Sequence, residues 1–145
     1  MKRSNLIVAA IAVLLACSFM WAQARKGKQV LFVSADQAKF QDAPNSNGRV
    51  SMAPVWGKAE TGAHATFTKF SPGYDAGMHT HTNDVSVVVI KGAYLYKDEA
   101  GEKRVGPGEF LRVPGGHKHW SGGDKNEGAL FYEESPGKFD LIPAK

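Results

Sequence analysis

The sequence GYDAGMHTHTNDVSVVVIKG occupies residues 73–92 and carries two histidines, His79 and His81, separated by one residue. Residues two apart on a β-strand face the same side, so the two imidazole rings can point at one position. The run VSVVVI that follows is rich in β-branched residues, which favour strands. The stretch therefore predicts two neighbouring strands, the first of which presents a histidine pair on one face.

A second pair, His117 and His119, lies in the sequence GEFLRVPGGHKHWSGG at residues 108–123. Imidazole nitrogens bind zinc, copper, iron and nickel, so two such pairs indicate a metal site. The ligand type alone does not choose among these metals.

Short apolar runs on both sides of these stretches are separated by turn sequences such as Gly-Pro-Gly and Pro-Gly-Gly. The chain has 145 residues, 16 of them glycine, and its 43% hydrophobic content is ordinary for a globular protein. This pattern predicts one all-β domain, an antiparallel sandwich or barrel, preceded by a helical turn over residues 34–42. The expected strands are residues 30–33, 50–55, 64–70, 78–82, 85–90, 93–97, 103–105, 109–113, 118–121, 129–133 and 139–142.

The first 24 residues have the three parts of a secretory signal peptide. A basic start precedes an apolar stretch at residues 6–20, and the small residues Ala22 and Ala24 follow. Cleavage after Ala24 predicts a periplasmic or secreted protein with no stable membrane insertion. Two alternatives stay open: an uncleaved membrane anchor, and lipoprotein processing at Cys17.

Loss of the signal peptide changes the composition. It removes two of the 18 basic residues and none of the 14 acidic ones, so the net charge falls from +4 to +2. It also removes the only cysteine, Cys17, so the exported domain has neither a disulfide nor a thiol nucleophile. Lysine and arginine are scattered without a basic stripe, and we therefore expect no nucleic-acid partner.

The two histidine stretches resemble the paired motifs of the cupin superfamily. The first motif, G-x5-H-x-H-x3-E-x6-G, corresponds to Gly73, His79, His81, Val85 and Gly92. The second motif, G-x5-P-x-G-x2-H-x3-N, corresponds to Gly108, Pro114, Gly116, His119 and Gly123. All but two positions match, because Val85 stands at the glutamate position and Gly123 at the asparagine position.

The flanking sequences, from about residue 50 to residue 142, resemble an uncharacterised bacterial cupin family akin to the cupin half of ChrR-type anti-sigma factors. The resemblance implies a cupin β-barrel or jelly roll, an antiparallel double-stranded β-helix. Cupins commonly form dimers through edge strands, so we expect a homodimer. The predicted organisation is a signal peptide at 1–24, a tail and lead-in segment at 25–48, and the cupin domain at 49–145.

The resemblance also implies that His79, His81 and His119 are metal ligands inside the barrel. The glutamate ligand of the motif is absent, and regular strand alternation places Val85 on the same side as the first two histidines. Three neutral imidazoles leave the full +2 charge on the ion and leave coordination positions open for water or substrate. We expect a divalent ion, either Zn, Fe, Cu or Ni; the missing carboxylate disfavours manganese.

Two further histidines have several interpretations. His117 follows a Pro-Gly-Gly turn and could be a fourth ligand, a hydrogen-bond donor to a ligand, or a rim residue, and we favour the rim. His64 lies on the strand before the first motif, and we favour a histidine whose hydrogen bonds are satisfied within the barrel over one that serves the site.

Other polar residues are weaker candidates. Asn83 and Asp84 follow the first histidine pair and could orient a ligand by hydrogen bonding. Glu133 and Glu134 lie on a late strand beside Tyr132, where alternation sends the two carboxyl groups to opposite faces. One entering the barrel could replace the missing glutamate or act as a general base. We favour the alternative that both belong to a solvated outer surface.

These observations support two functions of different classes. One is an exported metal-binding cupin that acts as an enzyme, dioxygenase-like or isomerase-like, on a small organic substrate. The alternative is a non-catalytic cupin that senses or binds a metal or a small ligand. A third possibility is a structural barrel that holds no ion.

Overall fold

A computed structural model describes residues 29–145 of the chain. The chain divides into two units, Met1–Phe32 and Val33–Lys145, and the strands all belong to the second. The predicted signal peptide, with its alternative lipidation site Cys17, lies outside the described residues, as do residues 25–28 of the predicted tail. Within residues 29–145, no helix has the length and apolar character needed to cross a membrane.

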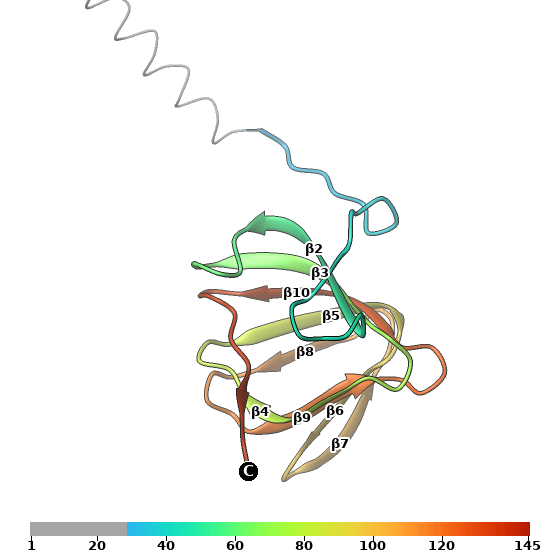
Figure 1. Cartoon of the computed structure of the whole chain (residues 1–145), viewed down its shortest axis with the longest axis vertical. Helices are drawn as coiled ribbons and strands as arrows, with labels where there is room; N and C mark the ends of the chain where they lie inside the picture. Colours follow the sequence, from blue (N-terminus) through green and yellow to red (C-terminus); the bar gives the residue numbers. More distant parts are fainter. Residues whose placement is uncertain (1–28) are drawn as a thin grey trace, which may run out of the picture. The chain divides into compact units, whose positions relative to one another are not determined.

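The second unit is built from eleven strands in two antiparallel sheets that face each other (Figure 1). Sheet A has the order β1-β2-β3-β10-β5-β8, and sheet B has the order β11-β4-β9-β6-β7. The strands are β1 (Gln41–Asp42), β2 (Val50–Gly57), β3 (His64–Phe70), β4 (Asp75–Thr80), β5 (Val85–Gly92), β6 (Tyr94–Asp98), β7 (Gly101–Val105), β8 (Phe110–Val113), β9 (His119–Gly123), β10 (Ala129–Ser135) and β11 (Ile142–Pro143). The predicted all-β jelly roll is confirmed.

The apolar core lies between the two sheets. Alternate residues Val85, Val87 and Val89 of β5 are buried, as period-two alternation requires of a strand with one face on the core. Tyr94 and Tyr96 of β6 meet them from sheet B. A fully buried valine contributes about 1.5–3 kcal/mol, so these strands account for much of the force that holds the sheets together.

The sequence predictions fail at both ends of the domain. Residues 30–33 form no strand, and the expected helical segment at 34–42 is reduced to one turn, in which Gln37 N donates to Ser34 O at 3.1 Å. Gln41–Asp42 instead pairs with β2, which gives the backbone groups at that sheet edge partners. Of the strand predicted at residues 139–142, residues 139–141 pair in no sheet, and only Ile142 lies in a strand, β11.

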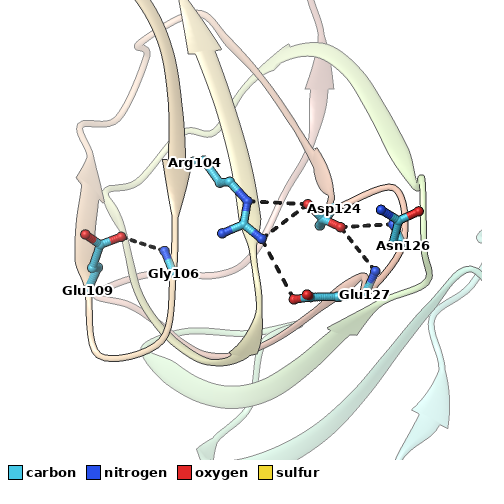
Figure 2. Close-up of polar contacts among 6 residues, drawn as sticks. All are labelled: Arg104, Gly106, Glu109, Asp124, Asn126 and Glu127. Carbon is cyan, nitrogen blue, oxygen red and sulfur yellow. Dashed lines mark hydrogen bonds and ion pairs between the residues drawn. The ribbon is translucent and has the colours of Figure 1, made fainter.

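Sheet B ends at β7, and a polar cluster anchors this edge (Figure 2). Arg104 of β7 contacts the carboxylates of Asp124 and Glu127 at 3.3 and 3.8 Å. Asp124 Oδ1 also accepts hydrogen bonds from the backbone N–H groups of Asn126 and Glu127, which close the turn between β9 and β10. The edge strand is therefore tied to the turn that leads back into sheet A.

Candidate metal centre

Three buried histidines converge on one point between the sheets. His79 lies on β4, His81 follows the end of that strand, and His119 begins β9. Their candidate ligand nitrogens all lie within 4.8 Å of one another. His79 and His119 are directly opposite each other across the β4–β9 pair, and their ring centroids are 4.3 Å apart. The three residues that the sequence predicted as ligands are thus brought together, and they could hold a metal ion.

Two of the rings are oriented by a backbone carbonyl two residues earlier. His79 Nδ1 bonds to Gly77 O at 2.8 Å, and His119 Nδ1 bonds to His117 O at 2.9 Å. A carbonyl can only accept, so each Nδ1 carries the proton and each Nε2 presents its lone pair. His119 Nε2 is buried without a hydrogen-bond partner. This is the tautomer and the second hydrogen bond that metal-binding imidazoles typically have.

His81 is oriented by a distant segment. Its Nδ1 donates to the backbone carbonyl of Asp140, 59 residues later in the chain. The Asp140 carboxylate in turn accepts hydrogen bonds from Thr82 N, at 2.8 Å, and from the Thr82 hydroxyl. Asn83 Nδ2 donates to Lys138 O at 3.1 Å, so two residues after the first histidine pair hold this terminal segment in place.

The electrostatics of the three rings suit metal binding. Burial lowers the pKa of His79, His81 and His119 below the ordinary histidine value, and neighbouring histidines lower it further. Backbone carbonyl acceptors oppose this shift in each case. All three rings are therefore neutral near pH 7 and can offer a lone pair without first losing a proton.

A bulge in β4 places the carbonyl that orients His79. The β4–β9 register is irregular between Asp75 and Met78, and Gly77 within it has φ = 71°, a backbone conformation that favours glycine. Asp75 Oδ1 accepts from Gly77 N at 2.7 Å and from Trp120 Nε1 at 2.6 Å. Trp120 follows His119 on β9, so strand alternation places the two side chains on opposite faces.

His117 stands apart from the three converging rings. Its side chain is about one-third exposed, and its Nε2 bonds to Asp98 Oδ2 at 3.0 Å. The same carboxylate oxygen accepts from the Tyr96 hydroxyl at 2.8 Å, and the Tyr96 ring stacks on His119 with centroids 5.5 Å apart. His117 is therefore a rim residue. Its backbone carbonyl, not its imidazole, contributes to the site, by accepting the hydrogen bond from His119 Nδ1.

The two departures from the cupin motif have structural explanations. Val85, at the glutamate position, is buried in the core cluster with Tyr96 and contributes no polar atom. At Gly123, the asparagine position, an added Cβ would lie 2.8 Å from Ser71 O and 3.1 Å from Phe70 Cβ. The close approach of this backbone leaves no room for an asparagine.

Asp84 does not have the role suggested for it. Its carboxylate accepts from Arg112 and from Gly115 N, at 2.8 Å for the latter, and it touches none of the three histidines. Asp140, which anchors the His81 carbonyl acceptor, was not identified as a site residue from the sequence. Only its place in the stretch Gly137-Lys-Phe-Asp140, part of the flanks that resemble the cupin family, could have drawn attention to it.

The expectation that both late glutamates are solvated is wrong for one of them. Glu134 is exposed and accepts from the Tyr132 hydroxyl at 2.8 Å. Glu133 is buried, and burial raises the pKa of its carboxyl group to about 7. Its register partner on β5 is the core residue Val87, so its side chain enters the barrel. It is not part of the group of ligand atoms within 4.8 Å of one another.

His64 is likewise not the satisfied histidine that we favoured. Its Nδ1 bonds to Gly62 O and to Gly137 O, each at 3.0 Å. Its Nε2 is buried without a partner. One cavity of about 210 Å³ is lined by His64 and Thr66 together with Met52 and Pro54 of β2. A separate groove of about 620 Å³ lies on the outer face of sheet B against Trp120.

The family described as ChrR Cupin-like domain matches residues 28–136, which is most of the chain. No curated protein matches the sequence significantly.

Several solved structures share the fold. The polyketide cyclase RemF from Streptomyces resistomycificus has a TM-score of 0.67 at 17% identity, over 81% of this chain and 87% of its own. An RmlC-like cupin from Shewanella frigidimarina has a TM-score of 0.57 at 18% identity, over 74% and 92% of the two chains. A structure described as the DMSP lyases RdDddP and RnDddQII has a TM-score of 0.60 at 16% identity, over 74% and 63%. At these identities the likeness shows the fold alone.

Proposed function

The chain belongs to the ChrR cupin-like domain family, and from this membership and its three converging histidines we propose that it binds one divalent metal ion through His79, His81 and His119. The single observation that carries the proposal is the shared orientation of these rings. Each Nδ1 is bonded to a backbone carbonyl, and each neutral Nε2 is left to face the common point. The unpartnered, buried His119 Nε2 fits a metal donor better than it fits a packed core residue.

Such an ion would be zinc, iron, copper or nickel. When bound, it would polarise an oxygen atom of a small ligand as a Lewis acid, because three neutral imidazoles leave its charge uncompensated. His117 lies on the rim and Val85 offers no ligand atom, so three protein ligands would leave open coordination positions. Open positions are typical of catalytic sites, whereas structural zinc sites are saturated by four protein ligands.

We therefore favour an enzyme that acts on a small organic substrate. Two structures of the same fold are described as a polyketide cyclase and as DMSP lyases, which supports a small-molecule role without naming a reaction. The alternative function is a non-catalytic cupin that senses or binds a small ligand or a metal. We further propose that the protein is exported after cleavage behind Ala24 and works as a homodimer in the periplasm or outside the cell.

The test is the metal content of the protein purified from its native compartment, measured by mass spectrometry of the metal. The wild type should hold about one ion per chain, and a variant with His79→Ala and His119→Ala should hold almost none. The control is His117→Asn, which alters the other member of the second pair and should keep the wild-type content. Equal metal content in the wild type and the double variant would refute the proposal.

A further inference from the structure

Within residues 29–145, three buried side-chain atoms lack a hydrogen-bond partner: His119 Nε2, His64 Nε2 and Glu133 Oε1. The first belongs to the proposed metal centre on sheet B. The other two belong to β3 and β10 of sheet A. A buried polar atom without a partner costs about 1–3 kcal/mol, so two of them on one sheet call for an explanation.

The two groups share one inner face. Glu133 is opposite Thr66 in the β3–β10 pair, and His64 is opposite Ser135. His64 and Thr66 are two residues apart on β3, so Glu133 and His64 are diagonal neighbours on the same side of sheet A. Such neighbours have Cα atoms about 7–8 Å apart, a separation that one small molecule can span.

His64 presents an acceptor with a defined direction. Two carbonyls compete for its Nδ1, which must therefore carry the proton, so Nε2 can only accept. Its arrangement is the one found in the metal centre, since Gly62 precedes His64 by two residues as Gly77 precedes His79. No group within the described part of the chain donates to this Nε2, so it is left to accept from an O–H or N–H group of a bound molecule.

Glu133 faces the interior from sheet A, opposite the fully buried Val87 of β5. The hydroxyls of Thr66 and Thr68 on the neighbouring strand β3 are bonded to each other at 3.0 Å. Among residues 29–145, no group forms a hydrogen bond with Glu133 Oε1.

The segment at residues 137–140 contacts both His64 of sheet A and His81, one of the three converging histidines. Gly137 O holds His64, and Asp140 O holds His81. Phe139 lies between them, with its ring centroid 6.5 Å from that of His64 and 5.4 Å from that of His81. Phe139 therefore packs against one histidine of each group, and the cavity of about 210 Å³ is lined by His64 and Thr66.

We propose that His64 and Glu133 form the ligand-binding wall of the barrel, where they hydrogen-bond the hydroxyl group of a small hydroxycarboxylate whose carboxylate faces the histidine centre. This inference rests on the proposed function, because the cation there supplies the attraction for the carboxylate. The single hydroxyl proton is donated to His64 Nε2, and the hydroxyl oxygen accepts from the protonated carboxyl group of Glu133, so both groups that lack partners gain one. A purely apolar ligand would leave both groups without a hydrogen-bond partner, and the free-energy cost of burying unpartnered polar groups disfavours it.

The test uses glycolate, the smallest member of this class, titrated calorimetrically into the zinc-loaded full-length protein. His64→Asn keeps a donor for the Gly62 and Gly137 carbonyls and removes the Nε2 acceptor. Glu133→Met keeps the length of the side chain and removes its hydrogen-bonding group. Each change should weaken glycolate binding about tenfold or more, while zinc content stays at the wild-type value. Glu134→Gln and His117→Asn, the exposed neighbours of similar chemistry, should bind glycolate as the wild type does.

Several results would overturn the inference. Unchanged glycolate affinity in both variants, or no glycolate binding by the zinc-loaded wild type, contradicts it, and loss of zinc from either variant would assign the two residues to the metal instead. Failure of the wild type to hold zinc is a separate result that refutes the metal proposal. If a variant does not fold, the wild type alone provides the test. Glycolate bound to it should give a nuclear Overhauser effect between the glycolate methylene protons and His64 Hε1. If this effect is not observed, the proposal is contradicted.

Discussion

The two sheets present different walls to the interior of the barrel, although both use histidines oriented in the same way. On sheet B, His79 and His119 are direct cross-strand neighbours, and their free nitrogens converge. On sheet A, His64 is opposite Ser135, and its free nitrogen has no second imidazole beside it. The same hydrogen bond from Nδ1 to a carbonyl thus gives converging rings, which could hold an ion, where strand register brings two histidines together. Where it does not, the hydrogen bond gives an isolated acceptor.

The comparison also explains where charge is tolerated. The sheet B wall consists of neutral rings with lowered pKa values, which suit a cation. The sheet A wall carries Glu133, whose carboxyl group is buried among apolar residues and loses its proton only with difficulty.

The largest effect should come from removing a ring from the converging wall. His79→Ala should lower zinc affinity by more than about 100-fold, beyond the 10–100-fold that loss of an outer hydrogen-bond partner usually costs. His64→Asn, the matched change on the other wall, should leave it within about twofold. Competition with a chromogenic chelator measures the zinc affinity of both variants. A large loss of zinc affinity in the His64 variant would show that His64 also binds the ion.

A smaller effect is expected at Asp140, which supports the converging wall from outside. Asp140→Ala removes the acceptor of two Thr82 hydrogen bonds and loosens the carbonyl that orients His81. Zinc affinity should fall about tenfold, as is usual when the partner that orients a ligand is lost. Asp36→Ala, which breaks only an exposed pair with Lys91, is the control and should have no effect.

Glu133 should make the stability of the metal-free protein depend on pH. The unfolded carboxyl group titrates near 4.5 and the folded one near 7, so the folded state binds the extra proton between these values and loses stability as pH rises through them. Glu133→Gln should therefore gain about 3 kcal/mol over the wild type above pH 8 and nothing below pH 4. Urea unfolding at both pH values measures this difference.

The histidine contributions cancel in that comparison, since both proteins carry them. Glu134→Gln, one residue further along β10 and exposed, should show no such pH dependence. A flat difference between Glu133→Gln and the wild type across the pH range would mean that the carboxyl group is solvated.

The smallest effect distinguishes the two glycines that orient a histidine from two residues earlier. Gly77 has φ = 71°, so Gly77→Ala should cost about 1–2 kcal/mol of stability and also weaken zinc binding. Gly62 is not among the positive-φ glycines, and a Cβ there meets no atom within 4 Å. Gly62→Ala should therefore be nearly neutral in thermal unfolding. Equal costs at both positions would show that the bulge in β4 does not require glycine.

Much of the fold and the converging histidines could be predicted from the sequence. Alternation over Val85–Val89 indicated a strand with one buried face, and turn residues separated it from its neighbours. The resemblance of the two histidine stretches to the cupin motifs implied all three ligands. The side chains of a strand alternate every two residues, so the spacing of apolar residues along the chain is enough to predict its buried face.

The tertiary structure decided the rest. Alternation implied that Glu133 and Glu134 face opposite ways, but only the register with β5 shows that Glu133 is the buried one. His117 and His119 share the spacing of the first pair, yet His117 precedes β9 and turns outward to Asp98. The hydrogen bond from His81 to Asp140 joins residues 59 apart. Such contacts depend on how distant segments meet once the chain is folded, and no spacing along the sequence encodes that.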